Sequence, residues 1–226
     1  MILKGTIVNI LAVFLGCLIG RYLGHLIPER MRRTIMMGLG LAVLLIGTQL
    51  ALQSKNPLIV IGAMLIGGII GEAFSIEARL ENIGHRLQQR FRDSGNVAEA
   101  FVTASLLYCI GAMAIMGSIQ DGLGDAPTIL YAKSALDGIA SVALTSTLGI
   151  GVVFSVIPLL IYQGGITLAA GWVHELLTDP VVAEMNATGG LLILAIGLDI
   201  LGIRKLPIGN LLPAIFVAAG IAIIIG

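Results

Sequence analysis

Six long apolar stretches, separated by short polar connections, constrain this chain more than any other feature. They cover residues 5–24, 35–52, 57–74, 98–118, 187–203 and 207–225. A helix of about 20 apolar residues crosses the hydrocarbon core of a bilayer. Only 12% of the residues are charged, about half the share of a soluble globular domain. The sequence therefore predicts an all-α polytopic membrane protein, with the lipid bilayer as its first partner, and excludes a soluble enzyme or a nucleic-acid binder.

A seventh apolar region, residues 129–173, sets the number of spans. As one helix it would be about 67 Å long at 1.5 Å per residue, which is about twice the hydrocarbon thickness. Two spans, 129–148 and 150–173, fit better, with a tight break at Leu148-Gly149-Ile150-Gly151. This interpretation predicts about eight transmembrane helices, with seven as the alternative.

The distribution of basic residues favours eight spans. Cytoplasmic loops of membrane proteins collect Lys and Arg. With eight spans, ten basic residues fall inside, in the loops after the first and third spans and in the Arg204-Lys205 turn, against Lys4 and Lys55 outside. With seven spans the score falls to eight against four. The N-terminus is therefore predicted outside, together with two loops that lack basic residues, 121–125 and 174–186.

An internal repeat relates the two ends of the chain. A shift of 150 residues aligns positions 40–57 with 190–207 without a gap, with seven identities in 18 positions. The repeat unit is five spans away from its copy, so the two copies would insert with opposite orientations, as in many secondary transporters. We expect one transmembrane domain, 1–226, with repeat 1 at about 5–74, linking spans at about 98–148 and repeat 2 at about 150–225. The alternative is chance apolar similarity, or a duplication kept for packing.

Residues 75–93 have a different character from the spans. Ile76, Leu80, Ile83, Leu87 and Phe91 recur at helical spacing and are interleaved with arginines. This pattern predicts an amphipathic helix on the cytoplasmic interface. It either anchors the loop or acts as a lever that joins the two repeats.

The fifth predicted span carries an unusual polar stripe. Lys133 and Asp137 are four residues apart and share one helix face, which Ser141 and Thr145 continue. Charged groups at membrane depth are costly, and they face other helices or a cavity. We therefore expect this face to line a pathway for an ion or solute. The alternative is a structural ion pair, with Lys133 extending to the outer surface and the hydroxyls bonded to the helix backbone.

A glycine-rich segment, Gly117–Asp125, precedes this span and supplies Gln120 and Asp121 as further pathway candidates. Either they line an external vestibule on irregular backbone, or they belong to an ordinary turn. Secondary candidates are the other polar residues inside the spans: Asn9, Gln163, Asn186, Asp199 and Asn210. Asp199 lies near Arg204 and Lys205 and is expected to form a salt-bridged helix end.

Small residues and prolines predict how the spans pack. Gly16, Gly20 and Gly24 recur every four residues, as do Gly67 and Gly71. Such faces allow close helix contacts, either within one chain or in a homodimer. Pro158 and Pro213 fall within spans and remove helical hydrogen bonds there.

Enzyme chemistry finds little support in the sequence. Asp137-Gly138-x-Ala140 resembles the start of a phosphatidyltransferase signature, but the Arg of that signature is missing and the next 20 residues contain no carboxylate. The histidines fall at span ends or in a loop, and there is no Cys/His cluster for a metal. We expect no catalytic residue, no metal and no cofactor.

Three blocks of sequence carry a family resemblance over nearly the full length. They are Gly117-Ser118-Ile119-Gln120-Asp121-Gly122, Lys133-Ser134-x-Leu136-Asp137-Gly138, and Gly189–Ile193 followed by Leu211–Ala214. With them the chain resembles the YqgA/YdfK-like membrane proteins (domain of unknown function 554). The resemblance implies a multi-pass protein of the bacterial cytoplasmic membrane, and it places family motifs on Gln120, Asp121, Lys133 and Asp137. It implies no activity.

Two functions remain from these observations. The first is a small secondary transporter or permease for an ion or small polar solute, with Asp137 binding a proton or cation and Lys133 balancing it. The second is a non-transporting scaffold, sensor or assembly factor in which Lys133 and Asp137 form a structural pair.

Overall fold

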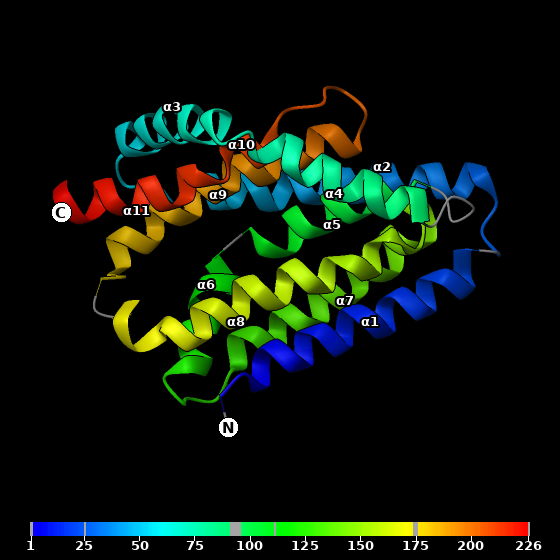
Figure 1. Ribbon diagram of the computed structural model, residues 1–226, viewed down its shortest axis with the longest axis horizontal. Coiled ribbons are helices and arrows are strands. Elements are labelled where there is room, and N and C mark those ends of the chain that lie inside the picture. The colour runs from blue at the N-terminus through cyan, green and yellow to red at the C-terminus, as the bar shows by residue number, and fades with distance from the viewer. Residues whose placement is uncertain (1, 25, 91–95, 111, 174–175, 226) are drawn as a thin grey trace. The chain divides into compact units, whose positions relative to one another are not determined.

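The computed structural model describes residues 2–24, 26–90, 96–110, 112–173 and 176–225. All regular secondary structure in these residues is helical, with no β-strand among them (Figure 1). In chain order the elements are α1 (Lys4–Gly24), α2 (Glu29–Ala51), α3 (Pro57–Ala73), α4 (Ile76–Arg90), α5 (Val97–Cys109), α6 (Ala112–Gly122), α7 (Thr128–Leu148), the 3-10 helix η1 (Ile150–Ser155), α8 (Val156–Val173), α9 (Asp179–Ile200), α10 (Ile208–Leu211) and α11 (Pro213–Ile225). The prediction of an all-α protein is confirmed.

Several of these helices are long and apolar enough to cross a membrane. Within the described residues there are five, and up to seven if the bent pairs α3–α4 and α5–α6, with bends of 54° and 62°, each count as one span. Helix α7 is not among them, although it coincides with the predicted fifth span, 129–148. The structure therefore supports a polytopic membrane protein, and the count of eight stays a prediction.

Helix α2 begins at Glu29, and the apolar span within it, Arg33–Ala51, agrees with the predicted span 35–52. One predicted boundary was wrong, because α9 begins at Asp179 rather than at residue 187. Much of the predicted external loop 174–186 is therefore helical, while residues 174 and 175 lie outside the described part. Thr178 and the Asp179-Pro180 pair explain the early start, because an N-cap Thr, an acidic first turn and Pro at the first position all favour a helix beginning.

The chain divides into two compact units. Unit 1 comprises Met1–Gly38, Glu81–Cys109 and Met113–Gly171, and unit 2 comprises Leu39–Leu80, Ile110–Ala112 and Trp172–Gly226. Each unit is described separately below.

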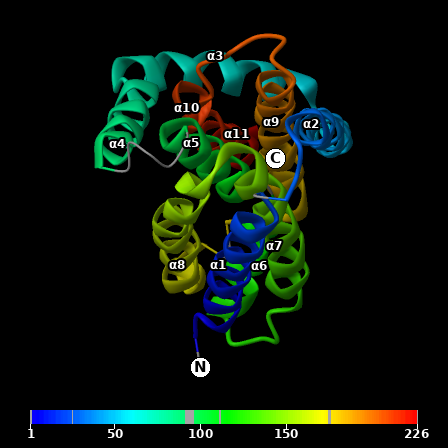
Figure 2. The ribbon, with the colours of Figure 1, turned by 90° about the vertical axis from the view of Figure 1, so that its right-hand side faces the viewer.

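In unit 1, α1 lies along α7 (Figures 1 and 2). The two helices run in the same direction, because Gly5 faces Leu130, Gly16 faces Gly138 and Gly20 faces Val142. A Cβ atom at Gly16 would collide with the carbonyl oxygen of Gly138. The predicted glycine face of α1 is therefore used for packing within the chain, and a homodimer would have to use other surfaces.

The predicted break after α7 is confirmed. Gly149 ends the helix with φ of +97°, a conformation that favours glycine. Helix η1 follows, with Gly151 against Val97 of α5, and α8 then runs back along α1 (Figure 1). Pro158 lies in the first turn of α8, which follows η1 directly.

In unit 2, two pairs of helices pack in antiparallel fashion. Gly40 of α2 faces Leu201 of α9, while Gly190 of α9 faces Ala51 of α2. Helices α3 and α11 meet in the same way at Gly67, which lies against Ala214. In the eight-span arrangement the members of each pair cross the membrane in opposite directions, whereas in the seven-span arrangement they would run the same way.

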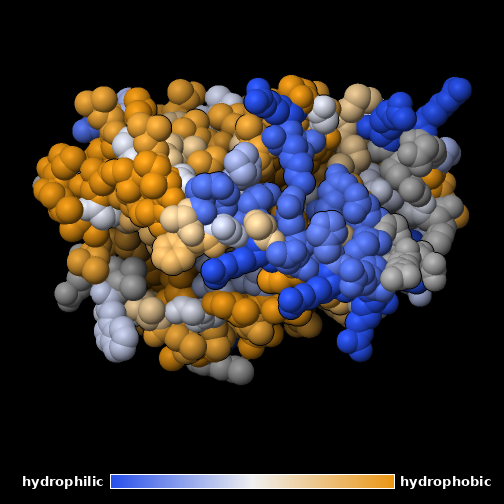
Figure 3. All heavy atoms as spheres, turned by 45° about the horizontal axis from the view of Figure 1, so that its top comes forward, coloured by the Kyte–Doolittle hydropathy of each residue, from blue (hydrophilic) through white to orange (hydrophobic). Residues whose placement is uncertain are grey.

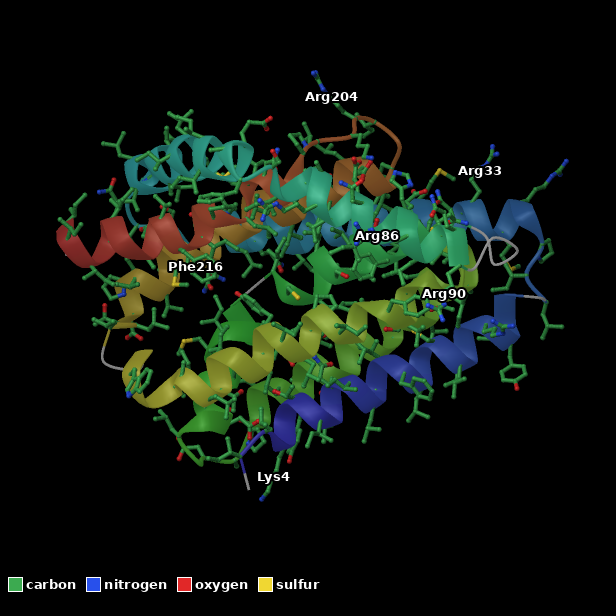
Figure 4. All side chains as sticks on the ribbon, in the orientation of Figure 1. Lys4, Arg33, Arg86, Arg90, Arg204 and Phe216 are labelled. Atoms are coloured by element: carbon green, nitrogen blue, oxygen red, sulfur yellow. The ribbon has the colours of Figure 1, made fainter. Side chains whose placement is uncertain are left out.

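Helix α4 corresponds to the predicted amphipathic helix over Ile76–Arg90, and residues 91–93 lie outside the described part. Arg86 and Arg90 extend from it (Figure 4). Gly84 packs against Ala98 at the start of α5, in unit 1. Its location at a membrane interface stays a prediction.

Apolar side chains are exposed on most of the helices. On α7, for example, Leu136 is 55% and Ile139 70% exposed. Figure 3 shows hydrophobic residues over a large part of one face, with hydrophilic residues gathered in one region of it. An apolar exterior around buried polar groups is the arrangement that a lipid environment requires.

Candidate functional site

The polar stripe of α7 is buried. Lys133, Ser134, Asp137, Ser141 and Thr145 are each less than 9% exposed, although they lie on a helix whose opposite face is apolar and exposed. The sequence therefore located this face correctly. Whether it lines a pathway stays a prediction.

An ion pair lies at the centre of the stripe. The Nζ atom of Lys133 is 2.5 Å from Oδ2 of Asp137, one helical turn further on. Burial of an unpaired charge is very costly, and a partner with good geometry offsets much of that cost. Each residue therefore serves as the counter-charge of the other inside unit 1.

Two amides from other helices complete the surroundings of Asp137. The Nδ2 atom of Asn9, on α1, donates to Oδ2 of Asp137 at 3.0 Å. The same atom lies 3.4 Å from Oε1 of Gln163 on α8. Asn9 and Gln163 are both fully buried. One secondary candidate, Asn9, thus bonds directly to the primary pair, and it links the pair to a second, Gln163.

Tyr108 is a member of the site that the sequence analysis missed. It lies on α5, is fully buried, and its hydroxyl is 2.7 Å from Oγ of Ser141. Ser141 in turn donates to the backbone carbonyl of Asp137, and Nζ of Lys133 lies 6.0 Å from the centre of the Tyr108 ring. A Tyr within an apolar span needs a partner for its hydroxyl, which is the signal that could have identified it.

Gln120 and Asp121 lie at the end of α6, which is regular helix as far as Gly122. The expectation of irregular backbone was therefore wrong at these two residues. Oε1 of Gln120 accepts from the N–H of Ile129, at the start of α7. Oδ2 of Asp121 accepts from the N–H of Gly5, at the start of α1, at 3.0 Å. Both side chains serve as caps for neighbouring helices in unit 1, whose first N–H groups otherwise lack partners.

The remaining candidates belong to unit 2. Asn186 donates to Oε1 of Gln53, and Asn210 donates to Oε2 of Glu72 while accepting from the N–H of Glu77. Asp199 lies half-buried in the last turn of α9. The structure gives Asn186 and Asn210 local structural partners, and the predicted salt bridge of Asp199 stays a prediction.

Glu184 is a second residue that the sequence analysis misjudged, because it was expected in an external loop. It is 2% exposed on α9 and accepts from Oγ of Ser54 and from the N–H groups of Lys55 and Asn56, at 2.7–2.9 Å. These residues immediately precede α3. Its negative charge therefore stabilises the beginning of that helix.

The part of the chain that the structure describes contains no candidate site for a transition metal. No group of three or more His, Cys, Asp or Glu side chains comes together there. The two free cysteines, Cys17 and Cys109, are buried and half-buried on separate helices.

Fold and site together define a polytopic α-helical membrane protein with a buried, hydrogen-bonded ion pair. The model of a protein family described as "Protein of unknown function (DUF554)" matches residues 4–223, and the chain belongs to this family. It is 35% identical over 217 residues to the "Uncharacterized membrane protein YdfK" of Bacillus subtilis, covering 94% of this chain and 93% of that protein. It is 36% identical over 220 residues to the "Uncharacterized protein YqgA" of Escherichia coli, covering 95% and 94%. No solved structure matches the chain.

Proposed function

We propose that this protein is a small secondary transporter or permease for an ion or a small polar solute, located in the bacterial cytoplasmic membrane. The observation that carries the proposal is the ion pair of Lys133 and Asp137, buried on a helix of unit 1 and contacted by polar groups from α1 and α5. Charges inside membrane proteins are rare and mark ion and substrate pathways.

Packing alone does not require this ion pair. Helices α1 and α7 already approach closely through Gly16 and Gly20, which rest on the backbone of α7. Small residues of this kind are sufficient to associate helices in a bilayer. A charged pair beside such a contact adds a desolvation cost, which selection retains where the charges serve a function.

The geometry suggests how the pair would work. A cation or proton that binds Asp137 competes with the ammonium of Lys133, which lies 2.5 Å away. Lys133 would then be free to hold an anionic group or to move aside. Asn9 and the hydroxyls of Tyr108 and Ser141 offer hydrogen bonds to a polar solute in the same place.

Helix packing in unit 2 supports the inverted repeat on which such a mechanism would run. The close contacts between α2 and α9 involve residues 40–51 of the first helix and residues 190–201 of the second. These two ranges differ by the same shift of 150 residues that aligns the sequences. In a two-fold arrangement equivalent helices cross at equivalent positions. Inverted repeats of this kind give transporters two related conformations, each open to one side.

A second candidate function remains, that of a scaffold, sensor or assembly factor. It is favoured by the direct contact of Lys133 with Asp137, since two charges that satisfy each other are sufficient for a structural role. A charge-swapped variant, Lys133→Asp with Asp137→Lys, separates the two functions. A structural pair would tolerate the exchange, whereas a binding site for a cation would lose its function.

The transport proposal is tested with purified protein in vesicles that contain fluorescent indicators for H⁺, Na⁺ or K⁺, under an imposed gradient of the ion that each indicator reports. We expect flux in the wild type, loss of flux in Asp137→Asn, and normal flux in Ile139→Ala, a matched change on the exposed face of the same helix. Thermal unfolding of each variant serves as the control for folding. Equal flux in the wild type and in Asp137→Asn, or none in the wild type, would contradict the proposal.

A further inference from the structure

Three helices of unit 1 enclose a second polar region, next to the ion pair. Helices α1 and α6 are joined by the bond from the N–H of Gly5 to Asp121. Helices α6 and α8 touch where Gly122 lies against the backbone of Thr167. Helices α8 and α1 are joined by Asn9 and Gln163. Each of the three helices, α1, α6 and α8, therefore contacts the other two, and together they form a triangle.

Buried polar atoms without a hydrogen-bond partner gather at this triangle. They are Oγ1 of Thr6, Oδ1 of Asn9, Oγ of Ser118, Nε2 of Gln163 and Oγ1 of Thr167. Each of these residues is at most 2% exposed. Each of the three hydroxyl residues lies one helical turn from a residue that makes one of these helix contacts. Ser118 precedes Gly122 on α6, and Thr6 precedes Asn9 on α1. Thr167 follows Gln163 on α8, so each hydroxyl residue shares a helix face with a contact residue. A buried polar atom that lacks a partner costs about 1–3 kcal/mol, so five such atoms on three helices that contact one another favour a bound ligand between them.

The three hydroxyls differ from most hydroxyls in the protein. Ser105, Ser134, Ser141 and Thr188 are buried in helices, and each donates to the carbonyl of the residue four positions earlier. This local bond is the usual solution for Ser and Thr in a membrane helix. Thr6, Ser118 and Thr167 do not make it, and their oxygens remain available to something else.

Where the structure describes unit 1, its buried charges do not balance. Asp121 and Asp137 are buried carboxylates, and Lys133 is the one buried cation among the described residues of the unit. Lys133 pairs with Asp137. Asp121, 2% exposed, has the N–H of Gly5 as its hydrogen-bond donor, and the side chain of the nearby Lys4 points away from α1 into the surroundings (Figure 4). Among the described residues of the unit, one negative charge is therefore left over.

We infer that Asp121, together with the side-chain oxygens of Thr6, Asn9, Ser118 and Thr167, forms a binding site for one monovalent cation between α1, α6 and α8. Hydroxyl, amide and carboxylate oxygens are hard ligands, which suit alkali cations rather than transition metals. A single carboxylate matches a single positive charge. The inference does not depend on transport, because a non-transporting protein can hold the same ion.

The experiment measures binding of radioactive Na⁺ to the purified protein by a scintillation proximity assay, with unlabelled NaCl, KCl, LiCl or choline chloride as competitor. We expect saturable binding that choline does not displace. Removal of one ligand to a charged group weakens binding by about tenfold or more. Asp121→Asn, which keeps an acceptor for Gly5, and Thr167→Val, which keeps the shape of the side chain, should both show this loss.

Thr188→Val is the matched control, since Thr188 is equally buried in unit 2 and its hydroxyl already bonds to the carbonyl of Glu184. It should bind Na⁺ as the wild type does. If Asp121→Asn does not fold, Thr6→Val and Ser118→Ala test the same site by removing only a hydroxyl. Absence of saturable cation binding in the wild type, or unchanged affinity in these hydroxyl variants, would overturn the inference and leave a site for water. Na⁺ binding without any flux in vesicles would leave this site in place while contradicting the transport proposal.

Discussion

The buried ion pair predicts a large and specific effect on stability. Replacing Asp137 with Asn leaves a residue of the same size that can still accept a hydrogen bond from Asn9. It removes the only negative charge within bonding distance of Lys133 in the described residues. The ammonium of Lys133, on a side chain that is 7% exposed, would then be buried without a counter-charge.

The size of the effect follows from the geometry. At 2.5 Å the two charges attract each other by about 7 kcal/mol with an effective dielectric constant of about 20. Much of this attraction is offset by desolvation, and removal of one partner of a buried pair costs about 3–5 kcal/mol. In a chain of this length, each kcal/mol lowers the melting temperature by about 2–4 °C, so we expect a decrease of roughly 6–20 °C.

Thermal unfolding is followed with a dye that becomes fluorescent when it reacts with thiols. Cys17 is 1% exposed, so it reacts only after unit 1 has opened. The double variant Lys133→Met with Asp137→Leu serves as the control. It removes both charges and fills the space, and we expect it to recover at least half of the lost stability, because apolar replacements of buried pairs are often close to neutral.

Two results would refute this reasoning. The first is an Asp137→Asn variant that melts within about 2 °C of the wild type, equivalent to less than about 1 kcal/mol. The second is a double variant no more stable than the single one, since the two positions would then not be coupled.

Three further predictions concern packing and hydrogen bonds, and the same melting assay tests them. Gly16→Ala forces a Cβ atom into the backbone of α7 and should lower the free energy of unfolding by about 1–3 kcal/mol. Its control is Gly165→Ala, where the added Cβ meets open space and stability should be unchanged or higher by up to about 1 kcal/mol. Equal effects of the two substitutions would contradict the packing of α1 on α7. Glu184→Ala removes the acceptor of three hydrogen bonds at the start of α3 and should lower the free energy of unfolding by about 2–4 kcal/mol. Glu184→Gln should cost less. A larger loss of stability in Glu184→Gln than in Glu184→Ala would argue against capping. Tyr108→Phe loses the bond to Ser141 but keeps the ring, and should cost about 1 kcal/mol; an unchanged stability would mean that this bond contributes nothing.

Local features of the sequence were sufficient for much of the fold. The start of α3 at Pro57 and the break at Gly149 follow from residues whose backbone preferences act locally. The buried stripe on α7 followed from Lys133 and Asp137 because their spacing places them on one helix face. Gly16 and Gly20 indicated a close helix contact, although not which helix provides it.

The remaining features depend on contacts between distant parts of the chain. Glu184 looks like a loop residue until the N–H groups of Lys55 and Asn56, almost 130 residues earlier, are brought to its carboxylate. Asp121 looks like a turn residue until it reaches Gly5. A polar side chain that satisfies a distant helix end has no local signature. The sequence alone therefore placed Glu184 in an external loop and left Asp121 either in a vestibule or in a turn.

The most direct test of a pathway along α7 is the accessibility of single cysteines in the membrane. Cysteines replace Ser134, Ser141 and Thr145 on the buried face, and Leu136 and Ile139 on the exposed apolar face, in a variant that lacks Cys17 and Cys109. A thiol reagent that does not cross membranes is then applied from each side. We expect the buried-face cysteines to react from at least one side while those at positions 136 and 139, surrounded by lipid, do not. If the buried face stays unreactive from both sides in a folded protein, the stripe is packed protein and the transport proposal is wrong.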